Sequence, residues 1–305
     1  MLSLVLPVYN EAPLLPELHR RLLDASGRTG LAFEVVYVDD GSSDGSLEIL
    51  RGLSHGDARV VVIGLSRNFG HQIALTAGLD QARGDAVVLM DSDLQDPPEL
   101  IPELVARWRE GFDVVYAQRR ARSGESAFKR ATAYGFYRFM RWLASVDIPA
   151  DTGDFRLLSR PAADALRSLR ERRRFLRGLV AWTGFRQGHV VYDRAPRQSG
   201  ESKYSVRQMV RLALFGLFSF SNLPVAVVGL AGTAVCVASV LALLLGTPAV
   251  TAGLFFLGGV QLLAAWVLGQ YVAAAAEEAR GRPLYVIKTD SRVLHENAPS
   301  APSDP

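Results

Sequence analysis

The 305-residue sequence contains a single cysteine, Cys236, so a disulfide framework and a cysteine-based zinc site are both excluded. Its five histidines are scattered and show no metal-ligand spacing. The formal net charge is only +3, from 34 basic and 31 acidic residues, so we expect no nucleic-acid partner. The chain also lacks a GxxxxGK[ST] loop, and no GxGxxG follows its first apolar run. A P-loop nucleotidase and a classical dinucleotide enzyme are therefore disfavoured.

Charged residues are absent from one long stretch, between Leu212 and Ala276. About 20 apolar residues are needed for a helix to cross a bilayer, so this stretch can supply two crossings. We expect transmembrane helices at about 225–246 and 252–274, with GTPAVT as the outer turn. Basic residues flank the pair on both sides, which places both ends in the cytoplasm. The alternative is a buried helical hairpin of a soluble protein.

The segment before the apolar pair, residues 206–223, carries Arg207 and Arg211 at helical i, i+4 spacing among Val, Leu and Phe. This pattern is typical of an amphipathic helix that lies in the membrane interface. The alternative, a third span, would move the C-terminal tail to the outside. We expect the tail, residues 277–305, to be cytoplasmic and its end after Asn297 to be disordered.

The first 120 residues alternate short apolar runs with helical patterns. Strands are predicted at Leu2–Val8, Phe33–Val38, Val60–Leu65, Ala86–Met90 and Asp113–Ala117. Helices are predicted at Leu14–Ser26, Ser46–Leu53, His71–Ala82 and Pro98–Arg109. The runs are apolar on both faces, as in a parallel sheet covered by helices. We therefore predict a doubly wound α/β fold, and we interpret the first run as a strand because it lacks the basic start of a signal peptide.

Two of the predicted strands run directly into acidic residues, Asp39 and Asp40 in one case and Asp91 and Asp93 in the other. Ligands of open α/β sheets bind beyond the carboxyl ends of the strands. Residues i and i+2 of an extended chain share a side, so Asp91, Asp93 and Gln95 can face one point. Carboxylate and amide oxygens suit Mg²⁺ or Mn²⁺. The alternative is that the acids of this loop only cap and solvate it.

Six motifs follow one another along the chain. They are LVLPVYNE (4–11), VDDGSSDGS (38–46), SRNFGHQIALTAGLDQARGD (66–85), DSDLQDPPE (91–99), TGDFRLLSR (152–160) and SGESKYS (199–205). With these motifs and the apolar hairpin, the chain resembles family 2 glycosyltransferases in the branch that uses polyprenyl phosphates. The resemblance runs from Leu2 to about Lys288. It implies a GT-A fold, with a mixed sheet and flanking helices, for a cytoplasmic catalytic domain over residues 1–205.

The resemblance also implies roles for individual residues. Residues implied for the donor nucleotide are Pro7, Tyr9, Asn10, Glu11, Asp39, Asp40, Asp91, Arg197 and Lys203. The divalent cation, Mg²⁺ or Mn²⁺, is implied at Asp91, Asp93 and Gln95, and Asp93 counts as catalytic. Residues implied for the acceptor phosphate are Arg119, Arg130 and Ser202. Arginine forks match phosphate oxygens, and the glycine-containing RQSGESKYS segment suits a mobile lid over phosphates.

Asp154 is the catalytic base that the resemblance implies. A phosphate monoester has a second pKa of about 6, so the acceptor is largely dianionic at neutral pH and needs little deprotonation. Asp154 can instead orient the sugar or stabilise charge at the anomeric carbon. A third interpretation is a loop acid that pairs with Arg156.

We therefore expect an inverting enzyme that moves one sugar from a nucleotide donor to undecaprenyl phosphate at the bacterial plasma membrane. UDP-glucose is the first choice of donor and a GDP-sugar the second, and a homo-oligomer, a tetramer, is implied by analogy alone. A processive polysaccharide synthase is one alternative, but residues 208–212, QMVRL, lack the tryptophan of the QxxRW signature of such enzymes. A non-catalytic sensor of nucleotide sugars is the other.

Overall fold

The computed structural model describes residues 1–120, 152–172, 174–193, 228, 231–232, 234 and 250–291. The chain divides into two compact units. The first unit consists of Met1–Gly124, Ile148–Glu201 and Pro283–Pro305, and the second of Glu125–Asp147 and Ser202–Arg282.

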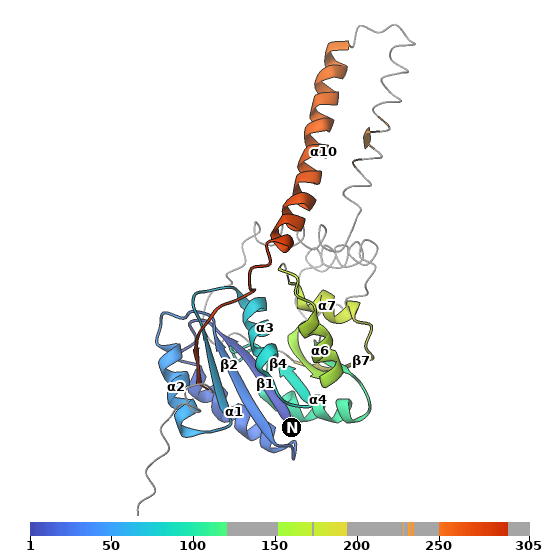
Figure 1. Cartoon of the computed structure of the whole chain (residues 1–305). Helices are drawn as coiled ribbons and strands as arrows, with labels where there is room; N and C mark the ends of the chain where they lie inside the picture. Colours follow the sequence, from blue (N-terminus) through green and yellow to red (C-terminus); the bar gives the residue numbers. More distant parts are fainter. Residues whose placement is uncertain are drawn as a thin grey trace, which may run out of the picture. The chain divides into compact units, whose positions relative to one another are not determined.

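The first unit is built on an eight-stranded mixed sheet, ordered β7-β5-β6-β4-β1-β2-β3-β8 (Figure 1). Its strands are β1 (Leu2–Val8), β2 (Phe33–Asp39), β3 (Val60–Leu65), β4 (Ala86–Leu89), β5 (Val114–Arg119), β6 (Thr152–Ser159), β7 (Gln187–Tyr192) and β8 (Ile287–Asp290). The four central strands β4, β1, β2 and β3 are parallel. Strand β6 is antiparallel to both β4 and β5, and β8 is antiparallel to β3.

Helices cover both faces of this sheet. One core lies under α1 (Leu15–Gly27), α2 (Ser46–Gly56) and α4 (Ile101–Arg109), which the short 3₁₀ turn η1 (Pro98–Leu100) precedes. The opposite core lies under α3 (His71–Gln81), α6 (Arg160–Ser168) and α7 (Leu176–Trp182). The predicted α/β class with a mixed sheet and flanking helices is therefore confirmed for this unit.

The two cores explain why the strands are apolar on both faces. Along β1, Leu4 and Leu6 belong to the core under α1, whereas Val5 between them belongs to the core under α3. Helix α3 lies especially close to the sheet at Gly78, where an added Cβ would overlap Val5 Cγ1 and lie 3.0 Å from Val38 Cγ2. A glycine at this position allows the close approach.

The predicted elements of the first 120 residues are all present. Strands β1 and β3 have the predicted bounds, and β4 ends one residue earlier, at Leu89. The predicted Asp113–Ala117 strand is shifted, because β5 runs from Val114 to Arg119. The helix predicted from Pro98 begins as η1 and continues as α4.

The segment that follows Arg282 returns to the first unit and adds a strand that the sequence did not predict. β8 pairs with β3, and the backbone N–H of Val62 donates to Ser291 Oγ at 2.9 Å. The hydroxyl of Tyr285 donates to Asp80 Oδ2 at 2.7 Å. Part of the predicted cytoplasmic tail, 277–305, is thus built into the sheet, and its end after Asn297 lies outside the described residues.

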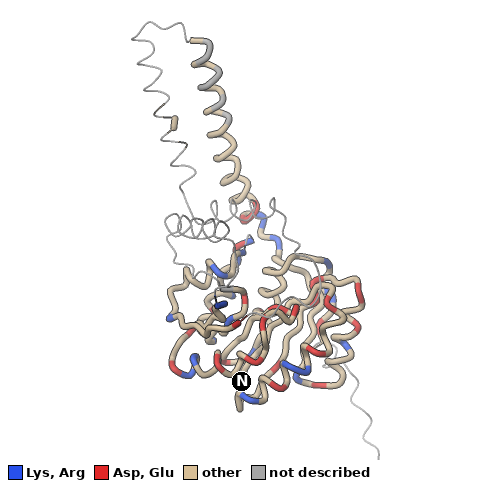
Figure 2. The backbone as a smooth tube through the Cα atoms, turned by 180° about the vertical axis from the view of Figure 1, so that it is seen from behind, with Lys and Arg blue, Asp and Glu red and all other residues tan. Residues whose placement is uncertain are grey.

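The described part of the second unit is chiefly α10 (Val250–Ala279), which contains the second predicted span, 252–274. Charged residues in α10 occur only at its C-terminal end, at Glu277 and Glu278 (Figure 2). No helix among the described residues is both long enough and apolar enough to cross a membrane, so the predicted transmembrane hairpin is not supported. The predicted interfacial helix 206–223 lies outside the described residues, as does 225–246 except for four isolated positions.

Candidate active site

The acidic residues that follow β2 and β4 lie at one edge of the sheet. These two strands flank β1 on either side and run parallel to it, so their carboxyl ends are neighbours. Such an edge is where open α/β sheets bind ligands. The structure therefore brings together the two acidic segments that the sequence placed far apart.

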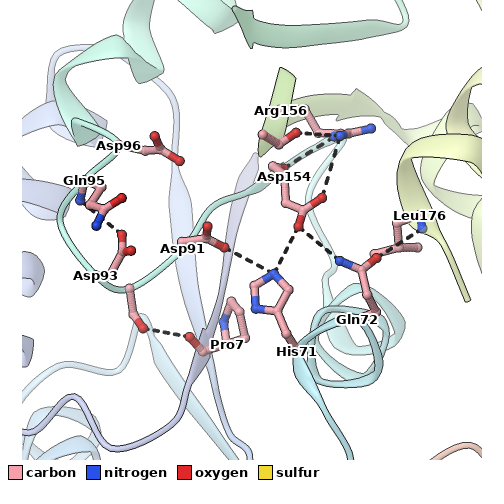
Figure 3. A network of polar contacts seen from close by, with 12 residues as sticks. Pro7, His71, Gln72, Asp91, Asp93, Gln95, Asp96, Asp154, Arg156 and Leu176 are labelled. Atoms are coloured by element: carbon pink, nitrogen blue, oxygen red, sulfur yellow. Dashed lines mark hydrogen bonds and ion pairs between the residues drawn. The ribbon is translucent and has the colours of Figure 1, made fainter. Parts of the chain in front are cut away.

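Three residues from different elements form a cluster at this edge (Figure 3). His71 begins α3, Asp91 follows β4, and Asp154 lies on β6. His71 Nε2 lies 3.2 Å from Asp91 Oδ1 and 3.2 Å from Asp154 Oδ2. Their nearest ligand atoms all lie within 4.8 Å of one another, a spacing compatible with a metal ion.

Asp154 is only 5% exposed, and both of its carboxylate oxygens are occupied. Arg177 Nε donates to Oδ1 at 2.9 Å, and Gln72 Nε2 donates to Oδ2 at 3.0 Å. Arg156 Nη2 lies 3.9 Å from Oδ1. Burial alone would raise the pKa of Asp154, but the hydrogen bonds from His71 and Arg177 and the arginine charges outweigh it and hold that pKa well below its usual range.

Gln72 connects this carboxylate to a third element. Its Oε1 accepts a hydrogen bond from the backbone N–H of Leu176 at 3.1 Å, at the start of α7. The amide is therefore fixed with its nitrogen toward Asp154 and its oxygen toward α7. Asp154 and Gln72 together tie β6, the beginning of α3 and the beginning of α7 to one another.

Asp91 has surroundings that suit a cation. Burial raises the pKa of Asp91 to about 6. Its Oδ1 is buried and accepts no hydrogen bond from any described residue, although His71 is an ion-pair partner. Burial works against charge on His71, but Asp154 and Asp91 outweigh it and raise the pKa of His71 to about 8. A protonated imidazole has no free lone pair, so it is not a metal ligand in this state.

Asp93 and Gln95 lie farther along the same loop as Asp91. Because β4 ends at Leu89, the alternation of an extended chain does not apply to this loop. Gln95 N donates to Asp93 Oδ1 at 3.1 Å, while Asp91 turns toward His71 (Figure 3). Ser92 Oγ donates to the Pro7 carbonyl at 2.8 Å and fixes the loop to β1.

These observations fit a divalent cation at the loop after β4. Its carboxylate and amide oxygens are the ligand types that Mg²⁺ and Mn²⁺ prefer. Asp154 fits the role less well, because its oxygens already accept hydrogen bonds from Arg177 and Gln72. Of the cluster His71, Asp91 and Asp154, Asp91 is therefore the better candidate for a cation ligand.

The predicted donor residues after β1 form a turn that is held by the loop after β2. Asn10 has a positive φ of 57°, and its Oδ1 accepts a hydrogen bond from Ser43 N at 2.8 Å. The backbone N–H of Glu11 donates to Ser46 Oγ at 3.1 Å. Tyr9 remains 43% exposed, so its ring is accessible to a ligand.

Asp39 and Asp40 are both 2% exposed but have different contacts. Asp40 accepts hydrogen bonds from Phe69 N at 2.7 Å and Gly70 N at 2.9 Å, so it fixes the turn that leads into α3. Asp39 Oδ1 is buried and accepts no hydrogen bond within the described part of the chain. Burial raises the pKa of both carboxyl groups. Asp39 is thus the better candidate to accept a hydrogen bond from a hydroxyl or N–H group of a bound ligand.

Arg119, predicted for the acceptor phosphate, ends β5 and donates from Nε to the Tyr192 hydroxyl at 3.2 Å. The remaining predicted site residues lie outside the described residues: Arg130, Arg197, Ser202 and Lys203.

Sequence reasoning missed His71, Gln72 and Arg177 as site residues. The first two lie in the SRNFGHQ segment, directly after Gly70, whose φ is +101°. The sequence did contain a signal for these two residues. Polar residues follow a glycine at the start of a predicted helix, and the next predicted strand ends in acids. Arg177 lies in a run of basic residues, RERRRFLRG, that the sequence offered for an anionic acceptor, but its contact with Asp154 arises only from the fold.

Acidic side chains thus follow two parallel strands at the edge where open α/β sheets bind their ligands. The model of glycosyl transferase family 2 matches residues 3–167. The chain belongs to this family, it is a glycosyltransferase, and its sheet unit has the GT-A fold.

Similar proteins cover nearly the whole chain. The uncharacterized glycosyltransferase YkcC of Bacillus subtilis is 44% identical over 94% of this chain and 93% of its own. The bactoprenol glucosyl transferase of Shigella phage SfII is 38% identical over 95% of this chain and 98% of its own. Among solved structures, the mannosyltransferase PcManGT from Pyrobaculum calidifontis, in complex with GDP-Man and Mn²⁺, covers 91% of this chain and 86% of its own, with 19% identity and a TM-score of 0.46.

Proposed function

We propose that this glycosyltransferase moves a single glucose from UDP-glucose to undecaprenyl phosphate, with inversion at the anomeric carbon. The observation that carries the proposal is the match to bactoprenol glucosyl transferases across almost the full length of both chains. The contacts of the described site residues support separate roles in binding the sugar donor and in binding the acceptor phosphate.

The donor nucleotide is proposed to bind at the turn after β1 and at the end of β2. Tyr9 offers an exposed ring on which a base can stack, and Asp39 offers a buried oxygen that accepts no hydrogen bond from the described residues. Pro7, Asn10 and Glu11 shape this turn through their contacts with the neighbouring loops. Asp40 contributes indirectly, since its carboxylate holds the turn before α3.

The loop after β4 is proposed to hold Mg²⁺ or Mn²⁺ through Asp91, Asp93 and Gln95. When bound there, the cation supplies positive charge that stabilises the departing diphosphate. The buried Oδ1 of Asp91 supports this role, because a buried carboxylate oxygen that accepts no hydrogen bond from the described residues is stabilised by a nearby cation.

The transfer itself exchanges one bond to the anomeric carbon for another. A phosphate oxygen of the acceptor forms a bond to C1 of glucose, and the bond from C1 to the β-phosphate oxygen of UDP breaks, with its electron pair leaving on UDP. The attacking phosphate is largely dianionic at neutral pH, since its second pKa is about 6, so no proton has to be removed.

We propose that Asp154 positions the helices around it rather than removing a proton from the acceptor. Both of its oxygens accept hydrogen bonds from cationic or amide donors, which leaves a poor proton acceptor. Its contacts with His71 and Arg177 instead fix the beginning of α3 and the beginning of α7 around the transfer site.

The acceptor lipid makes a membrane the proposed working place of the enzyme. Several large apolar side chains of α10 are exposed, and they include Leu254, Leu263, Trp266 and Val272. Exposed apolar surface of this extent is typical of contact with lipid or with a partner. Binding of the purified full-length protein to vesicles that contain undecaprenyl phosphate would support the proposal, and absence of binding to such vesicles would contradict it.

The function is tested by incubating purified protein with UDP- and GDP-sugars, with and without undecaprenyl phosphate, in the presence of Mg²⁺ or Mn²⁺. We expect UDP release from UDP-glucose only when the lipid phosphate is present. Polymer formation would identify a processive synthase instead, and tight donor binding without turnover would identify a sensor.

A further inference from the structure

The guanidinium of Arg119 lies where four segments of the first unit meet. Arg119 ends β5, Asp96 ends the acidic loop after β4, Gly153 lies near the start of β6, and Tyr192 ends β7. Figure 3 shows Asp96 in the same loop as Asp93 and Gln95. The loop proposed to hold the donor's cation therefore also contacts the arginine proposed for the acceptor.

The hydrogen bonds around Arg119 have a defined direction. Tyr192 has one hydroxyl proton, which it donates to Asp96 Oδ1, so the Tyr192 oxygen is left to accept from Arg119 Nε at 3.2 Å. Arg119 Nη2 lies 3.8 Å from the same Asp96 oxygen. Burial and the adjacent Asp96 raise the pKa of Tyr192 to about 12, so the phenol stays protonated at neutral pH.

Asp96 and Tyr192 are well shielded from solvent, with exposed fractions of 0% and 5%. The Arg119 side chain is 30% exposed. An arginine has five N–H donors in a fixed planar fork, and the bond to Tyr192 uses only the one on Nε. The exposed part of the fork can therefore present two parallel N–H groups to a phosphate.

Gly153 fixes the path of the same side chain. A Cβ added at Gly153 would lie 2.8 Å from Arg119 Nη2 and 3.8 Å from Asp96 Oδ2. The near atom is the tip of a flexible side chain, so a methyl group here would displace the guanidinium rather than the backbone. The glycine lets the Arg119 guanidinium pass close over β6 at this position.

We propose that Tyr192 and Asp96 are positioning residues that aim Arg119 at the phosphate of the lipid acceptor, along a path that Gly153 leaves open. This inference rests on the proposed function, since it concerns how that acceptor is held. Because Asp96 and Asp93 belong to one loop, a single segment then sets the spacing between the donor's diphosphate and the acceptor's phosphate.

The test measures steady-state kinetics of transfer from UDP-glucose to undecaprenyl phosphate for Tyr192→Phe and Gly153→Ala. Loss of one hydrogen bond to a charged group weakens binding by about tenfold, so we expect the KM for the lipid phosphate to rise about tenfold in each variant. The KM for UDP-glucose should stay within about twofold of the wild type. Arg119→Lys should show the same selective rise, because an ammonium cannot replace the planar fork.

The matched control is Tyr37→Phe, which removes the hydroxyl of a core residue on β2 that lies 3.2 Å from His19 Nδ1, and it should leave the KM for the lipid phosphate unchanged. An unchanged KM for the lipid phosphate in Tyr192→Phe and Gly153→Ala would overturn the inference while transfer by the wild type still supports the proposed function. Equal losses for both substrates, or loss of thermal stability, would also overturn it and indicate a purely structural cluster. Failure of the wild type to transfer glucose to the lipid would instead overturn the proposed function.

Discussion

At the residue scale, the acidic side chains of the site differ because their neighbours differ. Asp40 is engaged by backbone N–H groups, and Asp154 is engaged by cationic and amide side chains. Asp91 has one buried oxygen, Oδ1, that accepts no hydrogen bond from the described residues. A carboxylate thus has a different candidate role at each position. Asp40 anchors a loop, Asp154 is proposed to position its neighbours, and Asp91 is a candidate cation ligand.

Asp93→Ala should abolish sugar transfer while the protein remains folded. Removing a group that stabilises charge on the leaving diphosphate typically lowers kcat by about 100-fold or more. The measurement is UDP release with saturating undecaprenyl phosphate, with circular dichroism as the check on folding. Asp24→Ala is the control, since Asp24 is an exposed partner of Arg28 on α1. Transfer by Asp93→Ala at a near-normal rate would remove Asp93 from the cation site.

Asp154→Ala should destabilise the sheet unit as well as reduce turnover. It leaves Arg156, only 4% exposed, without its carboxylate, and removal of one partner of a buried ion pair costs about 3–5 kcal/mol. The free energy of unfolding from urea titration measures this loss. Asp164→Ala is the control, because Asp164 pairs with Arg167 but is 53% exposed and should cost less than about 1 kcal/mol. Equal, small losses for the two variants would contradict the positioning role of Asp154.

At the scale of elements, the site depends on how closely α3 approaches the sheet, because His71 and Gln72 begin this helix. Its central turn carries four consecutive buried residues, from Ala74 to Ala77, followed by Gly78 against β1. Small residues along this turn bring the helix near the strand, and the start of the helix is then within reach of Asp154 on β6.

Gly78→Ala should destabilise the unit by about 1–3 kcal/mol, because overpacking a dense core strains it by that amount. The added methyl group would meet Val5 and Val38. Gly52→Ala on α2 is the matched control, since an added Cβ there has no neighbour within 4 Å and alanine favours the helix by about 0.5–1 kcal/mol. The midpoint of thermal unfolding is measured for both variants. A Gly78→Ala protein as stable as Gly52→Ala would contradict the close approach of α3 to the sheet.

Local pattern was enough to predict the elements of the first 120 residues. Runs such as Leu2–Val8 are apolar on both faces, and a buried parallel strand is the structure that such runs favour. β8 escaped prediction because Ile287–Asp290 is short and half exposed, so its pairing with β3 depends on tertiary contacts.

The sequence also predicted which segments form the site, but not the contacts within it. The acids after β2 and β4 lie at one edge, as parallel strands require. The bond from His71 to Asp154 joins residues 83 positions apart, and that from Arg177 joins α7 to β6. Hydrophobic periodicity predicts helices and strands, but it does not predict contacts between residues so far apart in the sequence. The geometric argument for Asp91 and Asp93 also failed, because the extended backbone ends at Leu89.

At the scale of the whole molecule, one chain combines a sheet unit of the GT-A fold with a unit that contains the 30-residue helix α10. The proposed acceptor has the same dual character, with a phosphate that requires cations and an isoprenoid chain that requires apolar surroundings. We propose that Arg119 meets the first requirement and that the exposed apolar side chains of α10 meet the second. Transfer to a short, water-soluble phosphate should therefore be much slower than transfer to the lipid.

The most direct measurement is the mass of the lipid product after purified full-length protein acts on UDP-glucose and undecaprenyl phosphate. We expect one product, undecaprenyl phosphate with a single added hexose, that forms with divalent cation and disappears after exhaustive chelation. A lipid mass that does not change, a polymer of hexoses, or full activity after chelation would contradict it.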